Sequence, residues 1–116
     1  MRPSKNNVII GEQKGVVMEY KIDKDGTKVN ATVSGRIDTS TAPQLEEALL
    51  PELAGASEVV IDFKDLEYIS SAGLRLLLML QKKMNAANGT FKILNVNDFV
   101  MEVLEMTGFK DILTIG

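Results

Sequence analysis

This chain of 116 residues contains no histidine and no cysteine. Without histidine, a Ser-His-Asp hydrolase and imidazole acid–base catalysis are excluded. Without cysteine, thiol nucleophiles, disulfides and zinc sites built from Cys and His are excluded as well. A carboxylate site for magnesium or calcium needs an acidic loop of suitable spacing, and the sequence has none. These absences remove the common histidine, thiol and zinc chemistries, and we expect no bound cofactor.

Long apolar runs and basic clusters are also missing. No segment approaches the ~20 apolar residues of a membrane-spanning helix, and residues 1–7 lack the apolar stretch of a signal peptide. The net charge is −3, and the one basic cluster is Lys82-Lys83, whereas nucleic-acid binding needs a concentrated basic patch. We expect a cytoplasmic protein that neither inserts into a membrane nor binds nucleic acid.

Length and composition predict one globular domain. Apolar residues make up 45% and charged residues 25%, as in ordinary soluble proteins, and the length suffices for a single core. Residues 1–15 form a polar lead with a short apolar patch at 8–10, which is either mobile or an edge strand. We assign residues 16–116 to the domain.

The patterns along the chain predict an α/β fold. Apolar and polar residues alternate over 17–22 and 29–34, on either side of an Asp25-Gly26 hairpin turn. Residues 59–63 have the continuous apolar character of a strand covered on both faces, and 91–94 follow as the next parallel strand. The acidic stretch that follows residue 63 is interpreted as a loop.

Three helices are predicted between and after these strands. The first has a capping-box pattern of Thr41 and Gln44, the second runs from Ser71 to Asn88-Gly89, and the third is capped by Asn97. The resulting order predicts a mixed β-sheet begun by an antiparallel hairpin, followed by alternating helices and parallel strands.

The most informative segment, residues 65–78, delivers two serines to the start of the second predicted helix. Ser71 is predicted to be its N-cap, because a serine oxygen accepts from the free N–H groups of the first turn. The same N–H groups and the helix dipole favour a phosphate on that hydroxyl. An ordinary structural cap is the alternative interpretation, and Ser70 is the neighbouring candidate.

Two more residues stand near this segment in the predicted fold. Asp38 follows the second strand, at the sheet edge where open α/β sheets form crevices, and is either a turn residue or part of the serine site. Gly73 marks either a close approach by a partner or a packing position within the domain.

One face of the second helix is predicted to bind a protein. Ser71, Arg75, Met79 and Lys82 share this face by spacings of four, four and three. A methionine flanked by basic residues suits a binding surface, and the alternative is that Met79 packs at the edge of the core. The core side is predicted to hold Gly73, Leu77, Leu80, Met84 and Ala87.

Three segments together resemble the STAS domains of bacterial anti-sigma factor antagonists and sulfate transporters. They are the octapeptide YISSAGLR at 68–75, Gly35-Arg36-Ile37-Asp38 followed by Ala42 and Leu45, and Met106-Thr107-Gly108-Phe109. They occur in the family's order over residues 16–116. The resemblance implies that Ser71 is the phosphoacceptor, with Ala72 and Gly73 in the same motif and Asp38 beside it. Ser70 stands where the best-studied members carry an acidic residue.

The resemblance also implies a function by partner switching, and therefore a protein that is not an enzyme. The unmodified protein would bind a serine kinase that is also an anti-sigma factor, and would thereby release a sigma factor. The kinase would use ATP and magnesium to phosphorylate Ser71, and a metal-dependent serine phosphatase would reverse the step. One rival is a constitutive STAS scaffold of a transporter or other assembly, which Ser70 favours. The other, a hydrolase using Ser71, is opposed by the lack of histidine.

Overall fold

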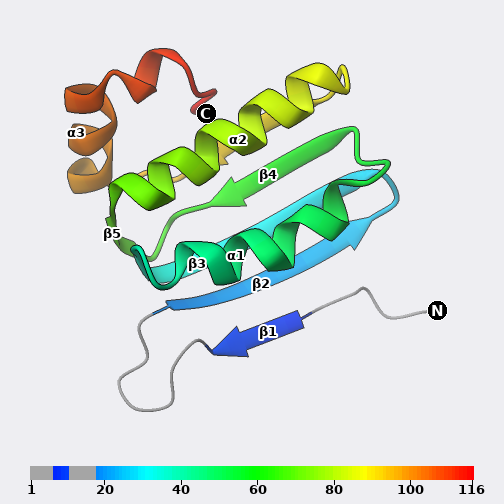
Figure 1. The fold of residues 1–116 in the computed structure, drawn as a ribbon, viewed down its shortest axis with the longest axis horizontal. Helices are drawn as coiled ribbons and strands as arrows, with labels where there is room; N and C mark the ends of the chain where they lie inside the picture. The colour runs from blue at the N-terminus through cyan, green and yellow to red at the C-terminus, as the bar shows by residue number, and fades with distance from the viewer. Residues whose placement is uncertain (1–6, 11–17) are drawn as a thin grey trace.

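The computed structural model describes residues 18–116 in full and the backbone of residues 7–10. A mixed six-stranded sheet runs through the molecule in the order β1-β2-β3-β4-β6, with β5 paired to β3 (Figure 1). The strands are β1 Asn7–Ile10, β2 Met18–Asp25, β3 Lys28–Ile37, β4 Glu58–Asp62, β5 Leu66–Ile69 and β6 Thr90–Leu94. The helices are α1 Ala42–Leu49, α2 Ser71–Ala86 and α3 Asp98–Thr107, with single 3-10 turns at Leu50–Leu53 and Phe109–Asp111. The predicted fold class is confirmed.

The sheet begins with the predicted antiparallel hairpin. Strands β2 and β3 pair from Met18↔Gly35 to Asp25↔Lys28, and Gly26 in the turn has a φ of 64°. A left-handed φ of this kind is what the glycine of an Asp-Gly turn provides. Strand β1 pairs antiparallel with β2, so residues 7–10 of the N-terminal lead form an edge strand.

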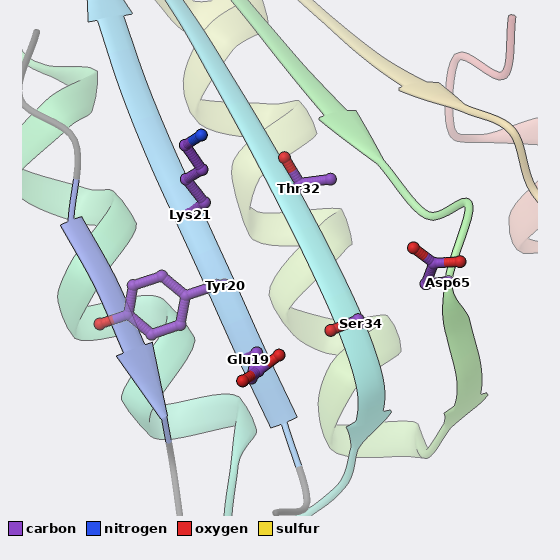
Figure 2. Close-up of a pocket in the computed structure, with 6 residues that line it drawn as sticks. All are labelled: Glu19, Tyr20, Lys21, Thr32, Ser34 and Asp65. Atoms are coloured by element: carbon purple, nitrogen blue, oxygen red, sulfur yellow. The ribbon is translucent and has the colours of Figure 1, made fainter.

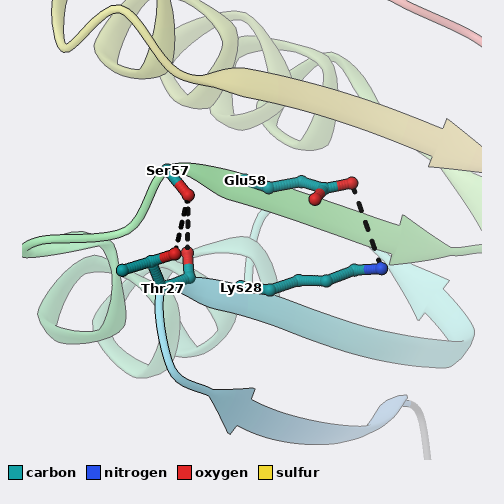
Figure 3. A network of polar contacts seen from close by, with 4 residues as sticks. All are labelled: Thr27, Lys28, Ser57 and Glu58. Carbon is teal, nitrogen blue, oxygen red and sulfur yellow. Dashed lines mark hydrogen bonds and ion pairs between the residues drawn. The ribbon is translucent and has the colours of Figure 1, made fainter.

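Polar contacts hold the start of the parallel part of the sheet. Ser57 Oγ donates to Thr27 Oγ1 at 2.8 Å, and Ser57 N donates to Thr27 O at 2.7 Å. One residue further along, Lys28 Nζ lies 4.0 Å from Glu58 Oε2 (Figure 3). Lys28 and Glu58 are also the first residue pair of the β3–β4 ladder, so these contacts lie where the two strands begin to pair.

Strand β5 is the main departure from the predicted element order, which placed an acidic loop there. Strand β4 pairs with the first half of β3 and then leaves it at Asp62. The chain returns to β3 at Asp65, whose carbonyl oxygen accepts a hydrogen bond from Gly35 N. Strand β5 then pairs with the second half of β3 as far as Ile37↔Ile69. Pairing with the free edge of β3 thus gives a strand in a segment that the sequence interpretation assigned to a loop.

Helices α1 and α2 cover one face of the sheet, and the core lies between (Figure 1). Its largest fully buried side chains include Phe63 and Ile61 from the sheet side, Leu45 and Leu49 from α1, and Leu77, Leu80 and Met84 from α2. The predicted core side of α2 is confirmed except at Ala87, which is exposed because the helix ends at Ala86.

Helix α3 stands at the end of the sheet, beside β5 and the start of α2 (Figure 1). Asn97 caps it as predicted, since its Oδ1 accepts from Val100 N at 2.8 Å. Asn97 Nδ2 also donates to Leu66 O at 2.6 Å, which ties the helix to β5. Beyond it, Ile115 forms an isolated parallel bridge with Ile93 of β6. Among the described residues, no helix is both long and apolar enough to span a membrane.

Candidate functional site

Two of the segments that the sequence singled out meet at one end of the sheet. Ile37 and Ile69 are the last paired residues of β3 and β5, and Ser70 N donates to Ile37 O at 2.8 Å. Because the two strands are parallel, Asp38 and Ser70 leave the sheet at the same edge. Helices α1 and α2 both begin at this end, which we call the serine edge (Figure 1).

The Asp38 carboxylate organises the turn into α1. Its Oδ1 accepts from Ser40 N at 3.0 Å, Ser40 Oγ at 2.9 Å and Thr41 N at 3.0 Å, with Thr41 Oγ1 at 3.2 Å. Partial burial raises the pKa of this carboxyl, but the hydrogen bonds from Ser40 and Thr41 outweigh it and leave the pKa below its ordinary value. Asp38 is therefore a negative charge held at the serine edge at neutral pH.

The predicted capping box at Thr41 and Gln44 is wrong. Thr41 already has helical dihedrals, and its buried hydroxyl turns back to the sheet, accepting from Asp38 N at 2.8 Å and donating to Arg36 O at 2.9 Å. Gln44 Nε2 reaches Ser40 O at 3.4 Å. The hydroxyl of Thr41 is thus used by the strand end that precedes the helix.

Ser70, and not Ser71 as predicted, is the N-cap residue of α2. Its backbone is extended, with φ −98° and ψ 179°, and its carbonyl accepts the first helical bond from Leu74 N at 2.9 Å. The bond from Ser70 N to Ile37 O holds it in the sheet, so the helix starts one residue later. The Ser70 hydroxyl makes no capping bond; its Oγ is buried and has no partner among the described residues.

Ser71 is therefore the first residue of the helix, and it is exposed. Its position places the hydroxyl next to backbone N–H groups of the first turn that have no partner within the helix. These groups and the positive end of the helix dipole favour an anionic group there. Ser71 is accessible to solvent, whereas the neighbouring Ser70 Oγ is buried.

Gly73 is a packing position of the domain. It is buried, and a Cβ placed on it would lie 2.6 Å from Ile69 Cγ1 and 2.7 Å from Ile37 Cγ2. The missing side chain thus lets α2 approach the ends of β3 and β5 closely. The space beside Gly73 is filled by the protein's own isoleucines.

The predicted binding face of α2 is partly open. Arg75 and Lys82 are exposed, as is Ser71, while Met79 is half-buried and packs against the core. Met79 and Arg75 line a groove between the two helices, together with Thr39, Ala42, Pro43, Glu46, Ala72 and Leu76. A second hollow continues along α2 and is lined by Leu78, Lys82, Lys83 and Ala86 besides Arg75 and Met79. Met79 thus belongs both to the edge of the core and to the surface.

Another hollow lies on the face of the sheet turned away from α1 and α2 (Figure 2). Its lining comes from β2, β3 and the segment before β5, and consists of Glu19, Tyr20, Lys21, Thr32, Ser34 and Asp65. It mixes charges of both signs, and none of the predicted site residues borders it. Among the described residues no cluster of three acidic side chains suits a metal ion. We therefore place the candidate site at the serine edge and the adjoining face of α2.

The sequence interpretation missed one contact at this edge. The Arg36 guanidinium lies over the Tyr68 ring, 4.2 Å from its centre, and thereby joins β3 to β5. Both residues stand in the motif segments, but their contact depends on the pairing of β5, which the local pattern does not indicate.

Comparison with known proteins finds matches in sequence. A family model described as Mlab, STAS domain matches residues 20–114. One relative is BtrV of Bordetella bronchiseptica, which is provisionally assigned as an anti-sigma factor antagonist. It is 33% identical over 100 residues, which are 85% of this chain and 86% of that protein. The anti-sigma-B factor antagonist of Bacillus subtilis is 29% identical over 99 residues, 85% of this chain and 89% of the relative.

Solved structures match in fold. An anti-sigma factor antagonist from Mycobacterium paratuberculosis superposes with a TM-score of 0.74 and 25% identity, over 84% of each chain. The antagonist SpoIIAA in its unphosphorylated form gives a TM-score of 0.73 and 17% identity, over 84% of this chain and 87% of the other. SpoIIAA of Bacillus in its phosphorylated form gives a TM-score of 0.67 and 16% identity, over 84% of this chain and 90% of the other.

Proposed function

We propose that this chain, which belongs to the STAS domain family, is an anti-sigma factor antagonist switched by phosphorylation of Ser71. Its relatives are named as anti-sigma factor antagonists, which are regulatory binding proteins rather than enzymes. The observation that carries the proposal is the contrast between the two serines: Ser71 is exposed on the first turn of α2, and the Ser70 hydroxyl is buried.

The proposed partner of the unmodified form is a serine kinase that also acts as an anti-sigma factor. It would bind over the serine edge and the α2 face that carries Arg75, Met79 and Lys82, and would transfer phosphate from ATP to the Ser71 hydroxyl. A metal-dependent serine phosphatase would restore the unmodified form. The apolar groove between α1 and α2, with Arg75 at its rim, supports this placement, because interface centres favour methionine and arginine.

The switch would act through charge. A phosphate adds about −1.5 to −2 charges on Ser71, at the edge where Asp38 already holds a carboxylate. Each like-charge pair formed at ~4 Å costs about 1–4 kcal/mol, depending on the local dielectric. Within the chain itself, the N–H groups at the start of α2 stabilise the phosphate. Phosphorylation would therefore change the binding face while leaving the fold intact.

Mapping the modified residue tests the assignment. The protein is incubated with its cognate kinase, ATP and magnesium, and the phosphate is located by peptide mass spectrometry. We expect Ser71→Ala to abolish incorporation and Ser70→Ala, the matched neighbour, to retain it. Phosphate confined to Ser70, or spread over unrelated serines, would show that exposure at the helix start does not select the acceptor.

A binding measurement tests the charge mechanism separately. Ser71→Asp should weaken affinity for the kinase by about tenfold or more, and Ser71→Asn, of the same size but neutral, should bind nearly as the parent does. Both variants should unfold within ~1 kcal/mol of the parent, since position 71 is exposed and an acid is favourable in the first turn of a helix. Equal affinities of the Asp and Asn variants would contradict the mechanism.

One observation favours a second function, that of a constitutive scaffold. Ser70 stands where the resemblance places an acidic residue, and its hydroxyl is buried without a partner among the described residues. In a scaffold the same face would bind its partner permanently, and Ser71 would not be modified. Isolation of the protein from its own cells, followed by intact mass measurement, separates the two: no phosphorylated fraction under any growth condition supports the scaffold.

A further inference from the structure

The exposed large apolar side chains gather in one part of the described chain, after β6. Within residues 18–116 they are Phe99 and Met106 on α3, exposed by 50% and 79%, and Ile112 just beyond it, exposed by 52%. Single exposed apolar residues are ordinary on protein surfaces. Three of them within fourteen residues, with none elsewhere in that range, form a pattern that marks an interaction site.

Two of these residues share one face of α3. Phe99 and Met106 are seven residues apart, which is two helical turns, and Val103 lies between them on the same side. Val103 is half-buried and packs against the core, while Val100 and Leu104 are fully buried beneath the helix. Phe99, Val103 and Met106 thus form an apolar line along one flank of α3, between its buried side and its acidic outer side, which we call the α3 stripe.

Acidic residues border the α3 stripe. Residues 98–111 contain four acids and one base, a net charge of −3, and the whole chain also carries −3. All of its net charge is therefore located in this segment, since the remaining twelve acids and twelve bases cancel. Lys110 pairs with Glu105 at 3.3 Å. Glu102, which is exposed and three residues after Phe99, has no ion-pair partner among the residues described.

We propose that the α3 stripe binds a basic amphipathic helix of a partner protein. An apolar line with an acidic border complements a helix that presents leucine-like residues on one side and Lys or Arg beside them. The same border opposes an anionic membrane surface, which attracts basic helices instead. It also opposes a symmetric dimer through α3, because two copies would bring like charges together.

This surface is distinct from the switch proposed above. The α3 stripe lies on a different element from the α1–α2 groove, and α3 is fixed to β5 through Asn97 rather than through Ser70 or Ser71. The two surfaces are therefore formed by different side chains, so variants of one surface can be measured separately from variants of the other. The proposal goes beyond the antagonist function, and it stands or falls without it.

Titration with a designed helix tests the proposal. The probe is a peptide of about 18 residues, five turns, with Leu on one face and Lys on the other; the control peptide carries Glu in place of Lys. The measurement is the change in amide NMR chemical shifts of the ¹⁵N-labelled full chain. We expect saturable changes in residues 98–112 with the Lys peptide and none with the Glu peptide. Phe99→Ala/Met106→Ala should weaken binding about tenfold or more, with an unchanged circular dichroism spectrum, since both side chains are exposed.

Matched charge variants and two further assays complete the test. Glu102→Gln should weaken binding and reduce its salt dependence, whereas Glu47→Gln, exposed on α1, should leave both unchanged. No saturable shifts, shifts centred on α2, or equal binding of the Glu peptide would overturn the proposal. Two other results would also overturn it. One is that the parent protein sediments with phosphatidylglycerol vesicles and the Phe99→Ala/Met106→Ala variant does not. The other is that the parent is a dimer in solution and the same variant is a monomer.

Discussion

At the scale of single residues, Asp38 does more than end a turn. One oxygen of its carboxylate accepts hydrogen bonds from Ser40 and Thr41, and these bonds hold the turn that leads from β3 into α1. The same carboxylate supplies the negative charge that the proposed phosphate would meet. The local structure and the proposed switch thus share one side chain, and its titration offers a way to examine the structural part alone.

Asp38→Asn should change how stability depends on pH. The folded-state pKa lies below the ordinary value of 3.8, so the charged form is bound more strongly in the folded state. That stabilisation is complete above the ordinary pKa and is lost as pH falls through the folded one. The parent should therefore lose more free energy of unfolding than the variant between about pH 5 and about pH 2, measured by urea titration.

Asp65→Asn provides the control for this measurement. Asp65 is exposed, and its carboxylate accepts no hydrogen bond within the described residues. Its substitution removes one carboxylate without removing the hydrogen bonds from Ser40 and Thr41, so a change seen only in Asp38→Asn is assigned to those bonds. At neutral pH, Asp38→Asn should also cost about 1 kcal/mol through weaker hydrogen bonds. Parallel curves for the parent and Asp38→Asn would mean that the carboxylate contributes no charge-dependent stability.

Gly73→Ala should destabilise the protein, although alanine is the better helix former. At an exposed helical position this change would stabilise by about 1 kcal/mol. Here the new methyl group would lie within 2.7 Å of two isoleucine side chains, and such overpacking costs about 1–3 kcal/mol. Chemical denaturation measures the difference, with Lys82→Ala on the exposed side of the same helix as the control. An unchanged or raised midpoint would mean that α2 shifts away from the sheet freely.

At the scale of elements, α2 serves two surfaces at once. Its inner side, with Leu77, Leu80 and Met84, forms much of the core, and its outer side carries Arg75 and Lys82. Met79 lies at the boundary, lining the groove toward α1 while packing against the core.

Truncation of Met79 and Arg75 should separate packing from binding. Met79→Ala should lower the free energy of unfolding by about 1–2 kcal/mol, less than a fully buried methionine, and should also weaken kinase affinity. Arg75→Ala should cost about 1–2 kcal/mol of binding with little change in stability. Thermal denaturation and affinity are compared for both variants. A large loss of stability with unchanged affinity for Met79→Ala would place that side chain in the core alone.

At the scale of the whole molecule, the serine edge and the α3 stripe, both proposed as binding surfaces, lie toward one end of the sheet. The serine edge and α3 both adjoin β5, while the opposite end is held by the contacts of Thr27, Lys28, Ser57 and Glu58. The core runs between these ends, from Met18 in β2 to Leu113 near the C-terminus. Strand β1 extends the sheet by pairing with β2 at its edge.

We propose residues 16–116 as the folding unit, and deletion of residues 1–15 tests this. The deletion removes β1, which pairs with β2 along four residues, but no residue of the core cluster from Met18 onward. The shortened protein should unfold in one cooperative transition at a lower temperature, because the β2 edge loses its hydrogen-bonded neighbour. A chain that fails to fold, or that unfolds in two steps, would place part of the folding unit in the N-terminal lead.

Features set by neighbours in the chain were predictable from the sequence alone. The Asp25-Gly26 hairpin, the three helices and the Asn97 cap depend on turn chemistry, periodicity and local hydrogen bonds, and each is present in the structure. The order of the three motif segments indicated the family for the same reason, since it is a property of the chain and not of its packing.

Features set by contacts between distant segments were decided by the tertiary structure. The free edge of β3 turned an acidic stretch into β5, and the bond from Ser70 N to Ile37 O moved the helix start by one residue. That single step left Ser71 exposed and the Ser70 hydroxyl buried, which no local pattern distinguishes in a pair of adjacent serines. Thr41 also departs from the predicted pattern: its hydroxyl donates to Arg36 O and accepts from Asp38 N, so it bonds the end of β3 instead of capping its own helix.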